Sequence, residues 1–112
     1  MAAKFVISKS SNGKFYFVLK AGNGETILQS QMYAALADTK AGIEAVRAAA
    51  AVDGRIQRLE SKKGEPYFTL VATNGQTVGQ SEMYSSARAR DNGIESVKKN
   101  APGAAVDDQS AA

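Results

Sequence analysis

The acids and hydroxyls that recur at fixed spacing are the side chains of this sequence that could carry catalysis. Glu44 and Glu95 lie 51 positions apart, and so do Ser30 and Ser81. A serine nucleophile needs a base to activate it, but the chain contains no histidine. No lysine has a spacing from the repeated serines that would indicate a Ser-Lys pair. Each glutamate directly follows an isoleucine on the flank of a predicted helix, where solvated side chains are ordinary. We therefore predict that the protein is not an enzyme.

Composition excludes thiol chemistry and disfavours a metal site. The 112 residues include no cysteine and no histidine, so disulfides, zinc fingers and thiol nucleophiles are ruled out. Asp107 and Asp108 form an isolated acidic pair, which is too small a ligand set for a hard cation. No apolar run is long enough to span a membrane or to act as a signal peptide. We expect a cytoplasmic protein without a cofactor, a metal or a membrane partner.

Tyrosines and a lysine on one predicted strand face are the signal for a binding surface. Tyr16, Val18 and Lys20 share this face in one half of the chain, and Tyr67 and Thr69 share it in the other. Single-strand binders stack bases on aromatic side chains within a positive groove. However, the net charge is only +3, and strand tyrosines usually stabilise cross-strand pairs. A binding or structural role with an unidentified protein partner is our first prediction, and weak single-stranded nucleic-acid binding is the alternative.

Two further features could serve a protein partner. Tyr33 follows Met32, and Tyr84 follows Met83, at the predicted junction of strand and helix. Tyrosines are frequent at interfaces, but a Met-Tyr pair at such a junction more often completes the core. Sheet edges could also accept an extended peptide, although lysines and Ser-Asn-Gly turns near the predicted edges favour protection against such pairing.

A tandem repeat positions these side chains. When the sequence is shifted by 51 positions, residues 13–50 and 64–101 align without a gap and share 17 identities in 38 pairs. A unit of about 50 residues buries too little apolar surface to be stable alone, so we expect the two repeats to share one core. The predicted parts are a first repeat over 4–52, a second over 55–103 and a polar tail over 104–112, within a single domain of residues 1–112.

Each repeat is predicted to contain three strands and one helix. A first short strand and a Gly-containing turn precede a strand rich in aromatic and branched residues. Asn23-Gly24 and Asn74-Gly75 then favour type I′ turns, which need positive φ at both central residues. The helices have apolar stripes of 3.6-residue period, formed by Leu36, Ile43, Val46 and Ala50 in the first repeat and by Ala87, Ile94, Val97 and Ala101 in the second.

Both predicted helices contain a glycine, Gly42 or Gly93, although glycine costs about 1 kcal/mol relative to alanine there. Its occurrence in both repeats indicates close contact between helix and sheet. Alternatively, the helices begin only near Ala41 and Asn92, where Asn92 and Glu95 would form a capping box. We favour the longer helix in each repeat.

The strand pattern predicts how the repeats combine. Phe17 and Leu19 share one strand face, as do Phe68 and Leu70. We assign this face to the helices and leave the opposite face open to solvent. The predicted fold class is α+β, with one antiparallel sheet and both helices on one of its faces, in a monomer. Residues 104–107 could add a last short strand.

The repeated motifs Tyr-Phe-x-Leu, Ala-x-Asn-Gly, Gln-Ser-x-Met-Tyr and Gly-Ile-Glu-x-Val resemble those of the YegP-like family of uncharacterised bacterial proteins. The resemblance covers about residues 4–107, and residues 92–102 are similar to the family's helix-and-stop motif almost without interruption. The first repeat departs from that motif at residues 47–51. The resemblance implies a fold in which strands are exchanged between the units of one sheet. It implies no activity, catalytic residue or cofactor.

Overall fold

The computed structural model describes residues 3–110, which form two units of three strands and a helix, followed by one more strand. This order confirms the predicted content of each repeat. The first repeat comprises β1 (Lys4–Lys9), β2 (Phe15–Lys20), β3 (Thr26–Gln29) and α1 (Leu36–Ala50). The short helix η1 (Asp53–Arg55) leads to β4 (Ile56–Glu60), β5 (Pro66–Val71), β6 (Thr77–Gln80) and α2 (Ala87–Asn100), and η2 (Ala101–Gly103) leads to β7 (Ala105–Asp108).

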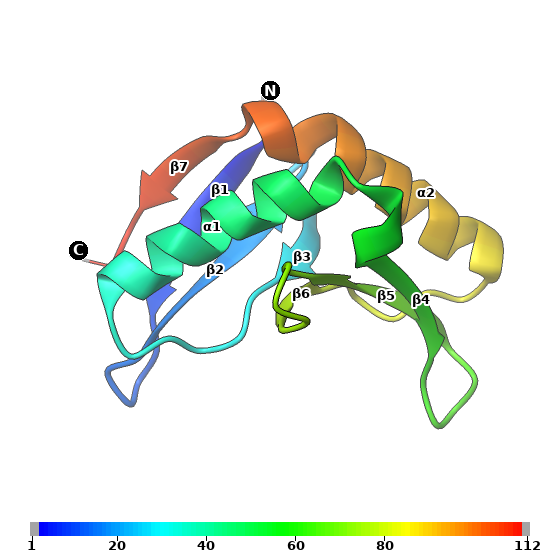
Figure 1. The fold of residues 1–112 in the computed structure, drawn as a ribbon, viewed down its shortest axis with the longest axis horizontal. Helices are drawn as coiled ribbons and strands as arrows, with labels where there is room; N and C mark the ends of the chain where they lie inside the picture. Colours follow the sequence, from blue (N-terminus) through cyan, green and yellow to red (C-terminus); the bar gives the residue numbers. More distant parts are fainter. Residues whose placement is uncertain (1–2, 111–112) are drawn as a thin grey trace.

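The described strands form one sheet in the order β4-β5-β6-β3-β2-β1-β7. Each repeat contributes an antiparallel three-stranded meander, and the two meanders meet at the centre, where Gln29 of β3 pairs with Gln80 of β6. Both helices lie over the same face of this sheet (Figure 1). The predicted α+β fold, with one sheet shared by two repeats, is confirmed.

Strand β7 exchanges between the repeats, because it follows α2 of the second repeat and pairs with β1 of the first. The pairing is parallel, from Lys4 opposite Ala105 to Ile7 opposite Asp108, whereas we predicted a wholly antiparallel sheet. A helix precedes β7 and carries the chain back across the sheet, so β7 starts at the same end as β1 (Figure 1). The segment predicted as a polar tail therefore includes a strand.

The core lies between the sheet and the two helices. Phe17, Leu19, Phe68 and Leu70 have no exposed surface, which places their strand face against the helices as predicted. The helical stripes supply the other side of this core, through Ile43 and Val46 of α1 and Ile94 and Val97 of α2.

The longer helix is present in both repeats, so the alternative start near Ala41 and Asn92 is wrong. Helix α2 begins after Ser86, whose Oγ accepts a hydrogen bond from the Ala89 N–H at 3.1 Å. A Cβ atom on Gly42 would lie 2.5 Å from Tyr33 Oη and 3.1 Å from Phe17 Cε2. The glycine thus allows close contact, as predicted, but its nearest neighbour is the tyrosine between β3 and α1 rather than the sheet.

The Asn-Gly turns differ from the predicted type I′ geometry. Only the glycine of each pair has positive φ, at 87° for Gly24 and 85° for Gly75, and no other residue type in the described chain does. The Ala21 N–H donates to Glu25 O at 2.9 Å, and the Gly24 N–H donates to Ala21 O at 2.9 Å. This pattern encloses a three-residue loop with glycine last, and its geometry is a type I turn followed by a bulge. All four hairpins of the sheet repeat it.

Candidate functional site

The repeated serines are structural in this fold. Ser30 Oγ accepts a hydrogen bond from the Phe17 N–H at 2.9 Å and donates one to Gln31 O at 2.8 Å. Ser81 Oγ makes the equivalent bonds with Phe68 N and Glu82 O at 3.0 and 2.8 Å. Both serines are buried, and their hydroxyls link the end of one strand to its neighbour.

The repeated glutamates lie on the outer surfaces of the helices. Glu44 forms an ion pair with Arg47 at 3.0 Å, and Glu95 forms one with Lys98 at 3.9 Å. Each carboxylate is about two-thirds exposed or more, and Glu44 lines an open cavity between α1 and β7. Among residues 3–110, no group of three or more Asp, Glu, His or Cys side chains could hold a metal ion, and no helix could span a membrane.

The face of the sheet opposite the helices carries one row of register partners across both repeats. Gln29 and Gln80 stand at its centre, and the pairs Val18 with Gln29 and Thr69 with Gln80 extend it on either side. The outer members are Val6, opposite Val18, and Gln57, opposite Thr69. Gln29, Gln57 and Gln80 are all exposed, so this row presents three carboxamides to solvent.

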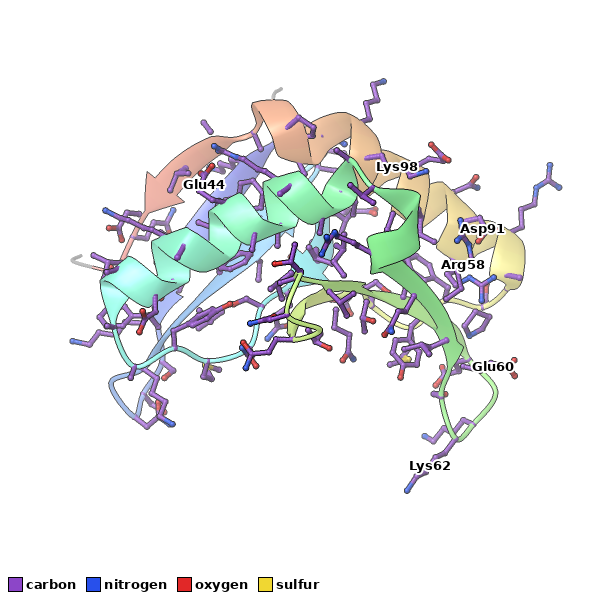
Figure 2. The ribbon with its side chains drawn as sticks, viewed as in Figure 1. Glu44, Arg58, Glu60, Lys62, Asp91 and Lys98 are labelled. Carbon is purple, nitrogen blue, oxygen red and sulfur yellow. The ribbon has the colours of Figure 1, made fainter. Side chains whose placement is uncertain are left out.

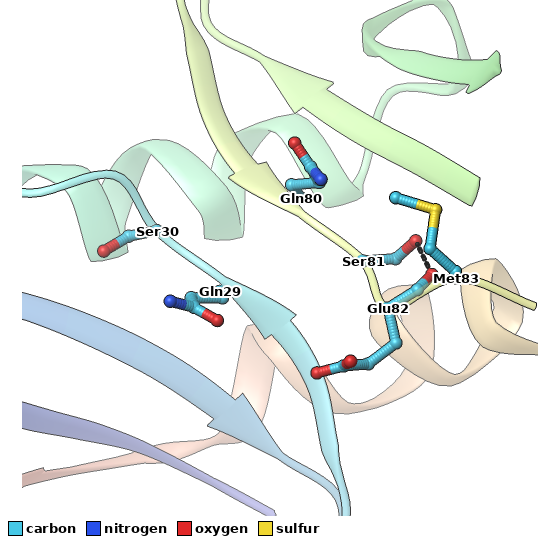
Figure 3. Close-up of a pocket in the computed structure, with 6 residues that line it drawn as sticks. All are labelled: Gln29, Ser30, Gln80, Ser81, Glu82 and Met83. Atoms are coloured by element: carbon cyan, nitrogen blue, oxygen red, sulfur yellow. Dashed lines mark hydrogen bonds between the residues drawn. The ribbon is translucent and has the colours of Figure 1, made fainter. Parts of the chain in front are cut away.

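Two adjoining hollows surround the centre of this row, and we call them together the glutamine groove. They share Gln29, Ser30 and Gln80 and have volumes of about 440 and 340 Å³. The larger hollow extends over β4 and β5, where Gln57, Leu59, Tyr67 and Thr69 line it. The smaller one adds Ser81, Glu82 and Met83, which follow β6 (Figure 3). The glutamine groove is therefore built from both repeats.

Two of the five predicted site residues line the glutamine groove. Tyr67 lies beside the larger hollow, and Thr69 lies beneath it with only 5% of its surface exposed. Thr69 Oγ1 donates a hydrogen bond to Gln57 Oε1 at 3.1 Å, so its hydroxyl already has a partner. The structure places Tyr16, Val18 and Lys20 on β2 of the other repeat, outside the groove lining.

The three glutamines were missed by the sequence reasoning, although a signal for two of them existed. Gln29 and Gln80 are identical in the two repeats and directly precede the repeated serines. Because these identical glutamines end equivalent strands of the two repeats, they could have indicated where the repeats meet at the centre of the sheet. Gln57 carried no comparable signal, because Val6 stands at the equivalent position of the first repeat.

The glutamine groove does not have the positive charge that a phosphate-binding site needs. Among the described residues that line it, Glu82 is the charged one, and none is lysine or arginine. Lys20 stands opposite Lys4 at the other end of β2, and Lys4 forms an ion pair with Asp107 at 3.3 Å. The positive charge of the open face therefore lies away from the groove.

Tyr33 and Tyr84 pack against the core. Of the two roles that the sequence suggested for them, core packing and partner contact, this is the first. Their rings stack on Phe17 and Phe68, with centroids 6.4 and 6.3 Å apart. Burial is the main cause that raises the pKa of both phenols above the ordinary value. The preceding methionines are exposed, and Met83 lines the smaller hollow of the groove.

Comparison with known proteins finds relatives that match the chain over nearly its whole length. A UPF0339 protein of Bordetella pertussis (strain Tohama I) is 52% identical over 112 residues and covers 100% of both chains. The UPF0339 protein YegP of Escherichia coli O157:H7 is 45% identical over 108 residues, which cover 96% of this chain and 98% of YegP. Neither name assigns an activity or a partner.

Solved structures of relatives match the whole fold. The solution NMR structure of a UPF0339 protein from Shewanella oneidensis superposes with a TM-score of 0.94 at 44% identity, over 99% of this chain and 94% of that one. The solution NMR structure of E. coli YegP, described as a protein of unknown function, gives a TM-score of 0.94 at 43% identity, over 100% and 97%.

A family model described as a domain of unknown function, DUF1508, matches residues 10–57 and residues 61–108. Each match begins in the turn after a first strand and ends in the strand that follows the helix, so β7 occupies the place in the second match that the start of β4 occupies in the first. These two adjacent matches confirm the resemblance drawn from the repeated motifs, and the chain belongs to the DUF1508 family, to which it contributes two copies of the unit.

Proposed function

We propose that this protein is a non-catalytic binding module that holds a segment of a protein partner in the glutamine groove. The observation that carries the proposal is the row of exposed carboxamides that crosses the junction of the two repeats. A carboxamide both donates and accepts hydrogen bonds, so it complements the N–H and C=O groups of a peptide backbone. Leu59, Tyr67 and Met83 supply apolar contact around this polar centre.

The absence of a reactive arrangement in the described residues supports a binding role. The repeated serines have their hydrogen bonds satisfied within the fold, and the repeated glutamates pair with basic residues on their own helices. The cytoplasmic location and the monomeric state that we expected from the sequence remain predictions.

Nucleic-acid binding is less well supported than protein binding. Tyr16, Val18 and Lys20 would form its surface together with Tyr67, because all four side chains belong to the open face. A stacked single strand needs cations along its path, and the groove between these two tyrosines has none among its described lining residues.

The test starts from peptides selected on the immobilised protein from a random peptide library. Each selected peptide is titrated into ¹⁵N-labelled protein while the backbone amide shifts are recorded. We expect shifts at Gln29, Gln80 and Thr69, and loss of binding in Tyr67→Ala. The matched control is Tyr16→Ala, which changes the equivalent tyrosine outside the groove lining and should keep the affinity within about twofold.

The same labelled protein is titrated with mixed single-stranded DNA and RNA at low and then moderate salt. Shifts centred on Tyr16, Val18 and Lys20 that fade as salt rises would support the nucleic-acid alternative and contradict our proposal. Selected peptides that bind without perturbing the groove would contradict it as well.

A further inference from the structure

The two edges of the sheet differ in how they are protected from pairing with another strand. At the β4 edge, Arg58 reaches α2 and forms an ion pair with Asp91 at 3.4 Å (Figure 2). A charged residue on the inner side of an edge strand discourages another strand from pairing there. At the opposite edge, the inner side chains of β1 are Phe5 and Ile7, which are fully buried. An edge strand with apolar inner side chains has no charge to discourage pairing, so it must be covered by another element. Strand β7 covers it by pairing with β1.

The attachment of β7 is slight. Four of its residues pair with β1, and three of these, Ala105, Val106 and Asp108, are exposed. The Gln109 N–H donates to Ile7 O at 2.9 Å, and Asp107 pairs with Lys4 at 3.3 Å between half-exposed side chains. Ion pairs this exposed contribute little to stability, so the side chains of β7 add little to its backbone pairing with β1.

The site that β7 occupies is only partly filled. Strand β1 has six residues, but its pairing with β7 ends at Ile7, so Ser8 and Lys9 have no β7 partner. On the helix side, an open cavity of about 430 Å³ lies beside Val106 and Asp108, with Ile43 of α1 as its apolar wall. A longer segment with a larger apolar side chain than valine would make contacts that β7 does not.

Basic side chains surround this site. Lys4 pairs with Asp107, and Lys40 of α1 lines the cavity beside Asp108. Arg47 Nη2 donates to Ala104 O at 2.6 Å, and its guanidinium lies over the Phe5 ring at 5.4 Å. Glu44 also lines the cavity, but it is paired with Arg47. The charge of the site therefore favours an acidic occupant, and β7 is acidic.

We infer that the outer edge of β1 is a binding site for an extended acidic segment of another protein, and that β7 is an internal occupant which this segment displaces. The segment lies parallel to β1, with a large apolar residue at the position of Val106 and acids at the positions of Asp107 and Asp108. A further acid lies opposite Lys9. Because a tethered strand competes at high effective concentration, the extra contacts must make the external segment bind more tightly than β7. The site is separate from the glutamine groove.

The test uses the full-length ¹⁵N-labelled protein and a capped peptide of sequence Ala-Ala-Leu-Asp-Asp-Gln-Glu. This peptide follows residues 104–110, with leucine at the valine position and glutamate opposite Lys9. We expect amide shifts at residues 5–9, 40–44 and 105–108, and movement of the β7 resonances toward random-coil positions. Weakening the internal strand by Gln109→Pro removes its hydrogen bond to Ile7, and should tighten peptide binding by about fivefold.

Three controls separate this site from other causes. A peptide with Lys-Lys in place of Asp-Asp should not bind, and N-methylation at the glutamine of the peptide should abolish binding by removing its donor to Ile7 O. Lys40→Glu should weaken binding by about tenfold, whereas the matched charge change Arg88→Glu, at an exposed site on α2, should not.

Several outcomes would overturn the inference. One is a wild-type protein that shows no shifts up to millimolar peptide, even if Gln109→Pro binds, because β7 would then not be displaceable in the native chain. Shifts along β4 instead of β1 would place the peptide at the wrong edge. Shifts of β7 that depend on protein concentration without any peptide would make a second copy of this chain the occupant.

Discussion

Leu28 occupies the space that a side chain on Gly79 would need. The two residues stand at equivalent positions of the two repeats, on the buried face of β3 and β6. A Cβ atom on Gly79 would lie 2.7 Å from Leu28 Cδ2 and 2.9 Å from Leu28 Cγ. The centre of the sheet is therefore asymmetric, because one repeat supplies the leucine and the other supplies the room for it.

Exchanging these two residues tests the relationship. Gly79→Ala should lower the free energy of unfolding by about 1–3 kcal/mol through overpacking, and Leu28→Ala should lower it by about 2–5 kcal/mol. The exchanged variant Leu28→Gly/Gly79→Leu should be more stable than the summed effects of Leu28→Gly and Gly79→Leu imply, because the leucine returns from the other side. Urea unfolding of the wild type, Leu28→Gly, Gly79→Leu and the exchanged variant gives the coupling energy. Strict additivity would show that the two positions do not share the space.

Separated repeats should recombine. If the chain is divided between Asp53 and Gly54, each half exposes one edge of the central pair, and we expect neither to fold as a monomer. Self-pairing would crowd two Leu28 side chains in one case and leave a void between two Gly79 residues in the other. An equimolar mixture should therefore restore the circular dichroism and the hydrodynamic size of the intact protein. Two independently folded monomers would refute a shared sheet.

Gly42→Ala should lower the free energy of unfolding, although alanine has a higher helix propensity than glycine. The gain of about 1 kcal/mol in helix propensity is opposed by the clash with Tyr33, and we expect a net loss of about 1–3 kcal/mol in thermal or urea unfolding. Gly54→Ala is the matched control, because nothing lies within 4 Å of a Cβ there, and it should change stability by less than about 0.5 kcal/mol. Adding Tyr33→Ala should remove most of the penalty of Gly42→Ala.

The buried serine hydroxyls should matter for stability. Ser81→Ala leaves the buried Phe68 N–H without its acceptor, which should cost about 1–3 kcal/mol. Ser85→Ala, at an exposed position four residues later, serves as the control and should be nearly neutral. Equal stability of Ser81→Ala and the wild type would mean that water replaces the hydroxyl.

Stability should fall at alkaline pH because of Tyr33 and Tyr84. Burial raises the pKa of both phenols in the folded state, so the unfolded chain ionises first as the pH rises past about 10. The stability present below that pH is then lost as the pH rises toward the folded-state pKa. Urea unfolding between about pH 9 and 11 should show a steeper loss in the wild type than in Tyr33→Phe/Tyr84→Phe. Parallel curves would contradict the assignment.

Strand alternation and repeat spacing were sufficient to predict most of the fold. Phe17 and Leu19 could be assigned to the helix face because side chains alternate along a strand, and the identical residues of the second repeat doubled the signal. The turn geometry could not be predicted from Asn-Gly alone, because the same pair suits a two-residue turn and a three-residue turn with a bulge. Flanking hydrogen bonds, such as that from Ala21 to Glu25, decide between them.

The candidate site depended on pairings that a single repeat does not contain. The open face was inferred correctly from Tyr16 and Tyr67, but only Tyr67 lines the groove. The contact of Gln29 with Gln80 arises where two repeats meet, so the periodicity of one strand gives no information about it. Thr69 is buried and its hydroxyl donates to Gln57 of the neighbouring strand, a contact that again follows from register between strands.

The pairing of β7 with β1 bears on how the protein is made. Residues near the two ends of the chain, such as Lys4 and Ala105, are neighbours in the finished sheet, so a ribosome releases the first strand long before the strand that covers it. During that interval the first repeat exposes two open edges, β1 on the outside and β3 toward the centre. Unpaired strand edges of nascent chains are aggregation-prone. The interval before completion is therefore the stage at which the exposed strand edges make the chain most prone to aggregate.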